Sequence, residues 1–339
     1  MDKAMDPAMD RAIIGIPMGD PAGIGPEIIV KALSNPHMYE ICKPVVVGSV
    51  VALRRIAKIL GSSVNFHEIS HPNDGFYVHG TIDVISCGEV SDEMEYGKVQ
   101  AVAGRAAFEC IECVAGLAMA GALDAIATTP INKESIRAAE IDFIGHTEML
   151  ESLSGTKELL TMFQVHTLRV FFLTRHVSLR RACELITNAR VSQYIELCSN
   201  ALKMLGVPNP LLAVAGLNPH NGEHGLFGNE EDLEIVPAVD SMKEAGFNVV
   251  GPVPPDSVFH QALTGRFDGV LSLYHDQGHI ATKTLDFERT IALTIGMPFL
   301  RTSVDHGTAF DIAGQGIAAS LSMEEAIRLA AEYAKTYKM

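Results

Sequence analysis

Short apolar runs alternate with longer amphipathic segments along most of the chain. The apolar runs are rich in β-branched residues, and "AIIGIP", "PVVVGS", "PLLAVAGL" and "GVLSLY" are typical of buried strands. Between them the apolar positions recur with helical spacing, which predicts helices at 26–33, 50–60, 96–120, 191–205 and 230–245. This alternation predicts an α/β fold with a mostly parallel sheet and helices on both faces. Ligands of such sheets gather at the carboxyl ends of the strands.

Bulk properties narrow the class of protein. The 339 residues are enough for two domains, and the net charge of −15 without any lysine- or arginine-rich run argues against nucleic-acid binding. No apolar run approaches the ~20 residues of a membrane span. Residues 1–12 lack the apolar core of a signal peptide, so we expect a disordered leader there and a cytoplasmic protein. An acidic protein that binds an anionic substrate must concentrate its cations locally, which draws attention to Lys283 and Arg301.

Six scattered cysteines predict reduced thiols rather than a disulfide framework. Cys110 and Cys113 form a CxxC inside a long helical pattern, with no second CxxC or histidine pair nearby. We interpret this pair as helix-packing residues, with a metal or redox role as the alternative.

Histidines follow the ends of three predicted strands. His176, His220 and His275 come just after "RVFFLT", "LLAVAGL" and "GVLSLY". Because parallel strands end at a common edge, the three imidazoles are candidates for one divalent metal site with an open position. Imidazole favours Zn, Co, Ni or Fe over Mg. We interpret His224 and His279 as exposed loop histidines.

A glycine-rich turn follows the first predicted strand. In "MGDPAGIGPEIIVKAL" the glycines are spaced G-x-x-x-G-x-G, which is not the dinucleotide fingerprint. A strand-to-helix turn without a ligand explains it equally well.

These motifs together resemble the PdxA family, whose named member is 4-hydroxythreonine-4-phosphate dehydrogenase of pyridoxine biosynthesis. The resemblance extends from about Ile13 to the end of the chain and rests on "GDPAGIGPE", "GHTE", "LNPHNGE", "YHDQGH" and "RTSVDHGTAFDIAG". The last motif is also similar to isocitrate and isopropylmalate dehydrogenases. The resemblance implies two α/β/α domains with a cleft between them. We expect residues 13–128 plus 298–339 in the first domain and 129–297, with the metal histidines, in the second.

The resemblance also implies roles for individual residues. Residues implied to bind the divalent ion, which would be Zn, Co, Mn or Mg, are His176, His220 and His275. Residues implied to hold the substrate are His146, Thr147, Lys283 and Arg301. His306 and Gly307 are implied to contact NAD, with NADP as the alternative. A homodimer is implied as well, with an active site at the interface that the partner chain completes.

The implied reaction is oxidation and decarboxylation of a small phosphorylated four-carbon 3-hydroxy acid. Candidates for the catalytic proton transfers are Asp276, Asp305 and Lys283, although aspartates near a histidine site more often orient an imidazole. A zinc hydrolase or lyase is a distant alternative, and a histidine-based metal-binding or sensory protein is the non-enzymatic one.

One departure from the family pattern bears on the substrate. The vitamin-pathway enzymes carry an asparagine nine residues before the arginine that matches Arg301, and this chain has Ala292 there. A second branch of the family oxidises D-threonate or D-erythronate 4-phosphate to dihydroxyacetone phosphate and CO2. We therefore keep that branch as the alternative to the 4-hydroxythreonine 4-phosphate activity.

Overall fold

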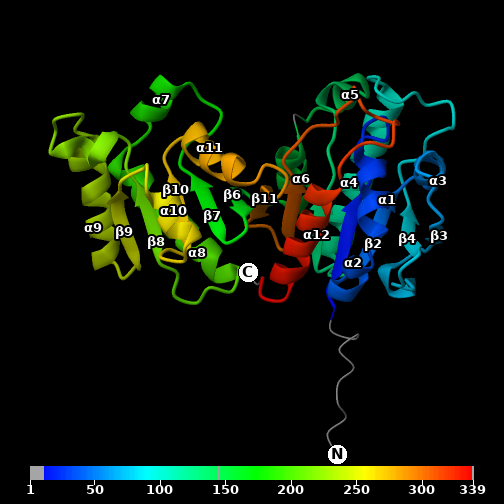
Figure 1. Ribbon diagram of the computed structural model, residues 1–339, viewed down its shortest axis with the longest axis horizontal. Coiled ribbons are helices and arrows are strands. Elements are labelled where there is room, and N and C mark those ends of the chain that lie inside the picture. Colours follow the sequence, from blue (N-terminus) through cyan, green and yellow to red (C-terminus); the bar gives the residue numbers. More distant parts are fainter. Residues whose placement is uncertain (1–10, 144, 338–339) are drawn as a thin grey trace, which may run out of the picture. The chain divides into compact units, whose positions relative to one another are not determined.

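The computed structural model describes residues 11–143 and 145–337. The chain divides into two compact units, one containing the residues up to Leu159 together with Gly296–Tyr337, and the other Leu160–Ile295 (Figure 1). The first unit therefore extends to Leu159 rather than to the expected residue 128, because the helices within 129–159 pack on a helix of that unit. Of the expected leader, only Arg11 and Ala12 are among the described residues, and the Ala12 carbonyl accepts a hydrogen bond from the Lys43 N–H at 2.8 Å.

The first unit is built on a parallel sheet. Its strands are β1 (Ile13–Pro17), β2 (Lys43–Gly48), β3 (Asn65–Glu68), β4 (Thr81–Ser86), β5 (Ala125–Thr128) and β12 (Leu300–Val304). They lie in the order β3-β4-β2-β1-β5-β12, and every neighbouring pair is parallel. The central strands are buried along almost their whole length, as their continuous apolar runs predict for a sheet covered on both faces.

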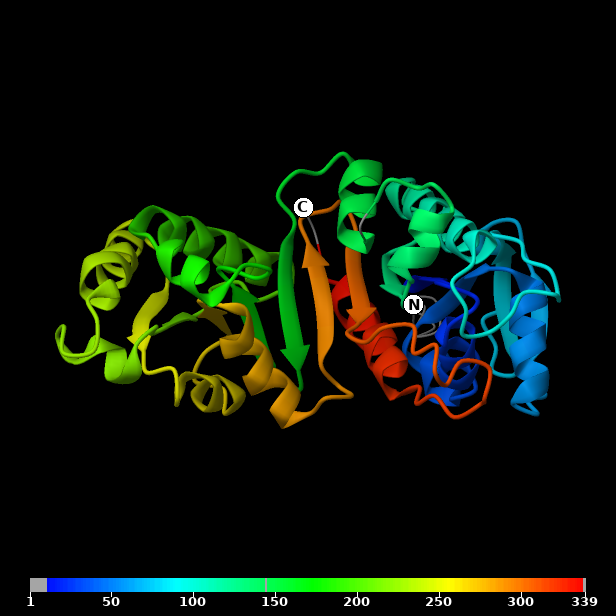
Figure 2. The ribbon, with the colours of Figure 1, turned by 90° about the horizontal axis from the view of Figure 1, so that it is seen from above.

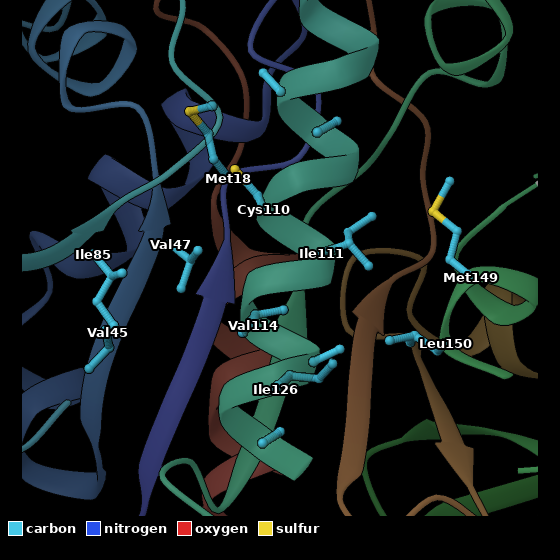
Figure 3. Packing of buried hydrophobic residues seen from close by; sticks show 14 of the residues in the cluster. Met18, Val45, Val47, Ile85, Cys110, Ile111, Val114, Ile126, Met149 and Leu150 are labelled. Carbon is cyan, nitrogen blue, oxygen red and sulfur yellow. The ribbon is translucent and has the colours of Figure 1, made fainter. Parts of the chain in front are cut away.

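Helices cover both faces of this sheet. They are α1 (Gly25–Leu33), α2 (Pro36–Ile41), α3 (Val50–Ile59), α4 (Ala101–Met119), α5 (Lys133–Ala138), α6 (His146–Ser154) and α12 (Leu321–Ala334), with the short 3-10 turn η1 (Pro72–Asp74). Helix α4 lies on one face with α5 and α6 packed against it, and α12 and α1 lie on the other (Figure 2). Helix α4 directs Cys110, Ile111 and Val114 toward strand residues such as Val47 and Ile126, which form the core of this unit (Figure 3).

The glycines in the turn after β1 allow neighbouring segments to pack closely. A Cβ on Gly25 would lie 2.4 Å from the Met18 carbonyl oxygen, and one on Gly23 would lie 2.8 Å from Thr308 Cβ. The Ile24 N–H donates to the Thr308 carbonyl at 3.1 Å. The motif thus holds the loop that follows β12, which agrees with the interpretation of a structural turn.

The second unit contains a mixed sheet. Its strands are β6 (Leu160–Val165), β7 (Leu168–Phe172), β8 (Leu212–Ala215), β9 (Val249–Val253), β10 (Gly269–Ser272) and β11 (Ile291–Ile295). In the order β11-β6-β7-β10-β8-β9, the first two pairs are antiparallel and the rest are parallel. Strands β6 and β7 must be antiparallel because only His166 and Thr167 connect them, which is too short for a parallel crossover.

The helices of this unit also lie on two faces. They are α7 (Leu179–Glu184), α8 (Asn188–Met204), α9 (Val236–Glu244), α10 (Val258–Leu263) and α11 (His275–Leu285), with the short helical turns η2 (Pro219–Glu223) and η3 (Glu231–Ile235). Figure 2 shows α8 on one face of the sheet and α11 on the other. In the part of the chain that the structure describes, no helix is both long and apolar enough to cross a bilayer.

Candidate active site

Two of the predicted metal histidines lie together in the second unit. His176 follows β7 and His275 begins α11 directly after β10, and these strands are parallel neighbours. Their carboxyl ends therefore share one edge of the sheet, and the two imidazole ring centres are 6.0 Å apart. Both rings line a cavity of about 380 Å³, together with Arg175, Val177, Ser178, Leu179, Ala182, Tyr274 and Asp276.

Three polar side chains lie on one side of α11. His275, His279 and Lys283 are spaced four residues apart, which places them on the same side of the helix. The His275 and His279 ring centres are 4.1 Å apart. Asp276 Oδ1 lies 2.7 Å from His275 Nδ1, so this carboxylate accepts a hydrogen bond there and leaves Nε2 available as a ligand. The Lys283 ammonium lies 5.2 Å from the centre of the Phe287 ring.

His220 has a different position. It follows β8, a parallel neighbour of β10, but lies in η2 with a left-handed backbone (φ 53°) and an exposed side chain. Glu231 fixes the start of this turn, because its Oε1 accepts from the Leu217 and Asn218 N–H groups at 2.7 Å each. Within the described ranges, no group of three or more histidine, cysteine or acidic side chains is arranged to hold a metal. The structure thus brings His176 and His275 together and leaves His220 outside the pair.

The first unit carries three of the predicted substrate residues. Arg301 is a buried residue of β12, and its Nε donates to Thr128 Oγ1 on the neighbouring β5 at 3.0 Å. Burial lowers the Arg301 pKa to about 10, so the guanidinium stays charged at neutral pH. Burial, and then the charge of Arg301, hold the His146 pKa well below its usual value, so His146 is a neutral imidazole. Its Nε2 is buried and forms no hydrogen bond with any described residue.

His146 and Thr147 begin α6, directly after the N-cap Gly145. A Cβ built on Gly145 would lie 3.9 Å from Lys133 Cε, so the Lys133 side chain reaches the start of this helix. A cation and the amino end of a helix both favour an anion. This arrangement is consistent with the predicted binding of an acidic substrate by Thr147 and its neighbours.

The predicted NAD residues lie in the loop after β12. His306 Nδ1 lies 3.0 Å from the Gly307 carbonyl oxygen, and a Cβ on Gly307 would meet no atom within 4 Å, so this backbone is open to a ligand. Further along, buried Glu27 of α1 accepts from the Ala318 N–H at 2.7 Å, and Lys31 donates to the Gly316 and Ala318 carbonyls at 2.9 and 2.6 Å. Asp305 is half-buried at the start of the same loop.

Sequence reasoning missed two residues of the second unit. His279 is not an exposed loop residue: it lies within α11, where its ring contacts Phe163 of β6 and Phe172 of β7 at 4.4 and 4.8 Å between ring centres. Gln277 joins two strand ends, because it accepts from the Leu273 N–H at 2.7 Å and donates to the Gly216 carbonyl at 2.8 Å. The i, i+4 spacing in "HDQGHIATK" was a signal that this segment is helical.

Comparison with known proteins identifies the family. The family model described as "Pyridoxal phosphate biosynthetic protein PdxA" matches residues 40–330. The chain belongs to the PdxA family. It is 57% identical over 330 residues to a Clostridium botulinum protein provisionally named D-threonate 4-phosphate dehydrogenase, covering 97% of this chain and 99% of the relative. A Fusobacterium nucleatum protein with the same provisional name is 57% identical over 329 residues, with the same coverage.

Solved structures agree with this assignment to PdxA. The chain is similar to 4-hydroxythreonine-4-phosphate dehydrogenase from Klebsiella pneumoniae, with a TM-score of 0.88 and 43% identity over 95% of this chain and 99% of that one. A terephthalate 1,2-cis-dihydrodiol dehydrogenase from Burkholderia xenovorans gives a TM-score of 0.65 and 28% identity over 95% and 98% of the two chains. The protein is therefore a PdxA-family dehydrogenase, an oxidoreductase, and the predicted α/β fold and enzyme class are confirmed.

Proposed function

We propose that the protein oxidises and decarboxylates D-threonate 4-phosphate, or its C2 epimer D-erythronate 4-phosphate, to dihydroxyacetone phosphate and CO2. The observation that carries this proposal is the 57% full-length identity to relatives provisionally named for the D-threonate activity, against 43% to the Klebsiella 4-hydroxythreonine-4-phosphate dehydrogenase. The sequence alone favoured the vitamin-pathway substrate. The relatives favour the alternative, so the aldonate phosphate now comes first.

The surroundings of Ala292 support the same choice. Ala292 lies on β11 opposite Phe163 and packs on the apolar cluster around that ring. Phe163 in turn contacts His279, which lies on the same side of α11 as His275 and Lys283. Ala292 is thus separated from His279 by one aromatic ring, and this chain has a methyl group where the vitamin-pathway enzymes carry an amide. A site without this amide fits a substrate whose C2 group differs from an amine.

His176 and His275 fit a divalent metal. Two imidazoles that ligate one ion at about 2.1 Å in tetrahedral geometry place their ring centres roughly 5.3 Å apart, so these rings, 6.0 Å apart, need to approach by less than about 1 Å. The hydrogen bond from His275 to Asp276 is the outer contact that metal-binding histidines usually make. A divalent ion held there supplies Lewis-acid chemistry, which lowers the pKa of an alcohol and draws electrons from a ketone.

We further propose that the protein is a homodimer and that His220 of a second copy of the chain supplies the third ligand. His220 is exposed, and exposed Leu226 and Phe227 lie close to it along the chain. Exposed Val177 and Leu179 line the His176 cavity. Apolar side chains that are exposed beside both parts of a divided site favour burial against a second copy.

The chain's own cations and donors fit a phosphorylated acid. Arg301 offers a charged, pre-positioned guanidinium, and Lys283 offers an ammonium. Neutral His146 has a buried nitrogen available to a substrate hydroxyl or carboxylate, and Thr147 offers a hydroxyl next to it. We assign Lys283 to the phosphate, and Arg301 with His146 and Thr147 to the remaining oxygens.

The open backbone at Gly307 and the clamped loop beyond it fit a dinucleotide, which supplies the hydride acceptor. Asp276 is engaged with His275, so we assign it an orienting role. Because Lys283 is assigned to the phosphate as an ammonium, which cannot accept a proton, we assign the hydroxyl proton to Asp305.

The test compares three substrates under identical metal and NAD concentrations: D-threonate 4-phosphate, D-erythronate 4-phosphate and 4-hydroxy-L-threonine 4-phosphate. NADH absorbance gives kcat/KM for each. We expect an aldonate phosphate to be preferred at least about tenfold, which corresponds to about 1.4 kcal/mol. Preference for the amino substrate would overturn the assignment and return the protein to the vitamin-pathway activity.

The shared metal site has a separate test. His220→Ala and His275→Ala proteins are each expected to be inactive, and unfolding followed by refolding of a mixture generates heterodimers. In a heterodimer one site would combine the intact His176 and His275 of one chain with the partner's His220, so activity returns. If all three ligands come from one chain, every site in the mixture lacks one histidine ligand and no activity returns.

A further inference from the structure

Three thiols gather outside the candidate active site, at the carboxyl end of β4. Cys87 directly follows that strand, and Cys110 and Cys113 lie one turn apart on α4. The Cys110 thiol donates to the Cys87 carbonyl at 3.6 Å, and the Cys87 thiol lies 3.4 Å from the Glu109 carbonyl oxygen. Cys87 and Cys113 both pack on the apolar cluster that contains Cys110, and Glu109 lies one turn before Cys113 on α4. The CxxC of the sequence therefore has a third sulfur beside it.

The three thiols differ in accessibility. Cys110 is fully buried and faces the core beside Met18 (Figure 3), whereas Cys87 and Cys113 are half-buried. The neighbouring thiols of Cys110 and Cys113 lower the pKa of Cys87, and the Cys87 thiol raises the pKa of Cys113. Because the thiolate is the nucleophile, Cys87 attacks first and Cys113 follows. The described residues contain no three-ligand metal group, so the geometry favours redox chemistry over metal binding.

We propose that Cys87 and Cys113 form a reversible disulfide when the protein meets a low-molecular-weight disulfide oxidant. The Cys87 thiolate attacks one sulfur of the oxidant, forms a mixed disulfide and releases one thiol. The Cys113 thiolate then attacks Cys87 Sγ, forms the internal bond and releases the second thiol. The two cysteines lose two electrons, the oxidant gains them, and the two cysteine protons end on the released thiols.

The bond would act on the helix that supports two substrate residues. A disulfide is about 2.05 Å long, which is shorter than any contact between two separate thiols, so oxidation draws α4 toward the end of β4. Helix α4 packs against α6, which carries His146 and Thr147, and against α5, where a Cβ on Gly104 would lie 1.9 Å from the Ser135 carbonyl oxygen. Because these helices are in such close contact, a shift of α4 also moves the helices packed on it. We expect oxidation to lower kcat/KM, an effect that rests on the proposed function.

The disulfide itself is tested without any substrate. The full chain is incubated with oxidised glutathione, free thiols are alkylated, and peptides are mapped by mass spectrometry. The half-buried Cys183 of the second unit serves as internal reference. We expect a Cys87–Cys113 linkage in the wild-type protein and in Cys110→Ala, formed faster than Cys183 is modified and reversed by dithiothreitol. In Cys113→Ser, glutathione should remain on Cys87.

Two results would overturn the proposal: an internal disulfide of Cys87 that still forms in Cys113→Ser, or modification of Cys87 no faster than modification of Cys183. The activity arm compares wild-type and Cys87→Ser proteins before and after oxidation. We expect a roughly tenfold or larger, reversible loss of kcat/KM in the wild type alone, since misplacement by about 1 Å is that costly. A mapped disulfide with unchanged activity would overturn the effect on the site. Absence of turnover before oxidation would instead count against the proposed function.

Discussion

Replacing Asp20 by asparagine tests the physics of the glycine turn after β1. Asp20 is fully buried, its Oδ1 accepts from the Ala22 N–H at 2.8 Å, and its Oδ2 forms no hydrogen bond with a described residue. Burial raises the pKa of this carboxyl from 3.8 to about 6, although the Ala22 N–H and the nearby Ser135 hydroxyl partly offset the rise. The folded protein thus holds the proton more tightly than the unfolded chain does.

The direction of the effect follows from proton linkage. Between about pH 4 and pH 6 the folded state binds more protons than the unfolded state, so the contribution of Asp20 to stability falls as the pH rises. At about 1.4 kcal/mol per pH unit, the ionised carboxyl costs folding about 3 kcal/mol above pH 7. An asparagine keeps the oxygen that accepts from Ala22 and carries no charge. Asp20→Asn should therefore be more stable than the wild type by about 1 kcal/mol near pH 4.5 and about 3 kcal/mol near pH 8.

Urea unfolding at several pH values measures this difference. Asp256→Asn, at an exposed carboxyl, controls for the loss of one negative charge. A gain for Asp20→Asn that does not change with pH, or a variant less stable than the wild type at pH 8, would refute the reasoning. Either result would mean that the buried carboxylate is compensated by contacts that the structure does not contain.

Variants at three further positions probe the candidate site. Ala292→Asn should shift kcat/KM by about tenfold toward 4-hydroxy-L-threonine 4-phosphate, the worth of about one hydrogen bond, whereas Ala292→Val should lower both activities without changing their ratio. Lys283→Ala should raise KM about 10- to 100-fold for D-threonate 4-phosphate but little for D-threonate, and equal effects would remove Lys283 from phosphate binding. Asp276→Asn should weaken metal affinity about 10- to 100-fold in a Co²⁺ titration because His275 loses its orienting partner, and an unchanged affinity would contradict that role.

The sequence pattern was sufficient for the fold class because buried parallel strands leave a strong signal. Runs such as "PVVVGS" became β2, and the helix expected at 96–120 became α4 at Ala101–Met119. The antiparallel pairing of β6 and β7 was also available, since only two residues separate those strands. The boundary between the two units after Leu159 could not be predicted from the sequence pattern. It depends on the packing of α5 and α6 against α4, which spacing along the chain does not reveal.

The site was predictable where strand order decides it. Because β7, β10 and β8 are parallel neighbours, His176, His220 and His275 all follow the same edge. Local backbone then separates them: His220 has a left-handed conformation in a turn held by Glu231. The spacing of hydrophobic residues along the chain does not predict this backbone conformation. The third cysteine beside the CxxC was hidden for a similar reason, because Cys87 reaches α4 only through the tertiary fold.

The most direct test of the central claim uses D-threonate 4-phosphate labelled with ¹³C at C1, together with metal and NAD. We predict that NADH, labelled CO2 and unlabelled dihydroxyacetone phosphate form in equal amounts, because oxidation at C3 creates a β-keto acid whose C1 carboxylate leaves. NADH without CO2, or no NADH from any four-carbon acid phosphate, would contradict the account.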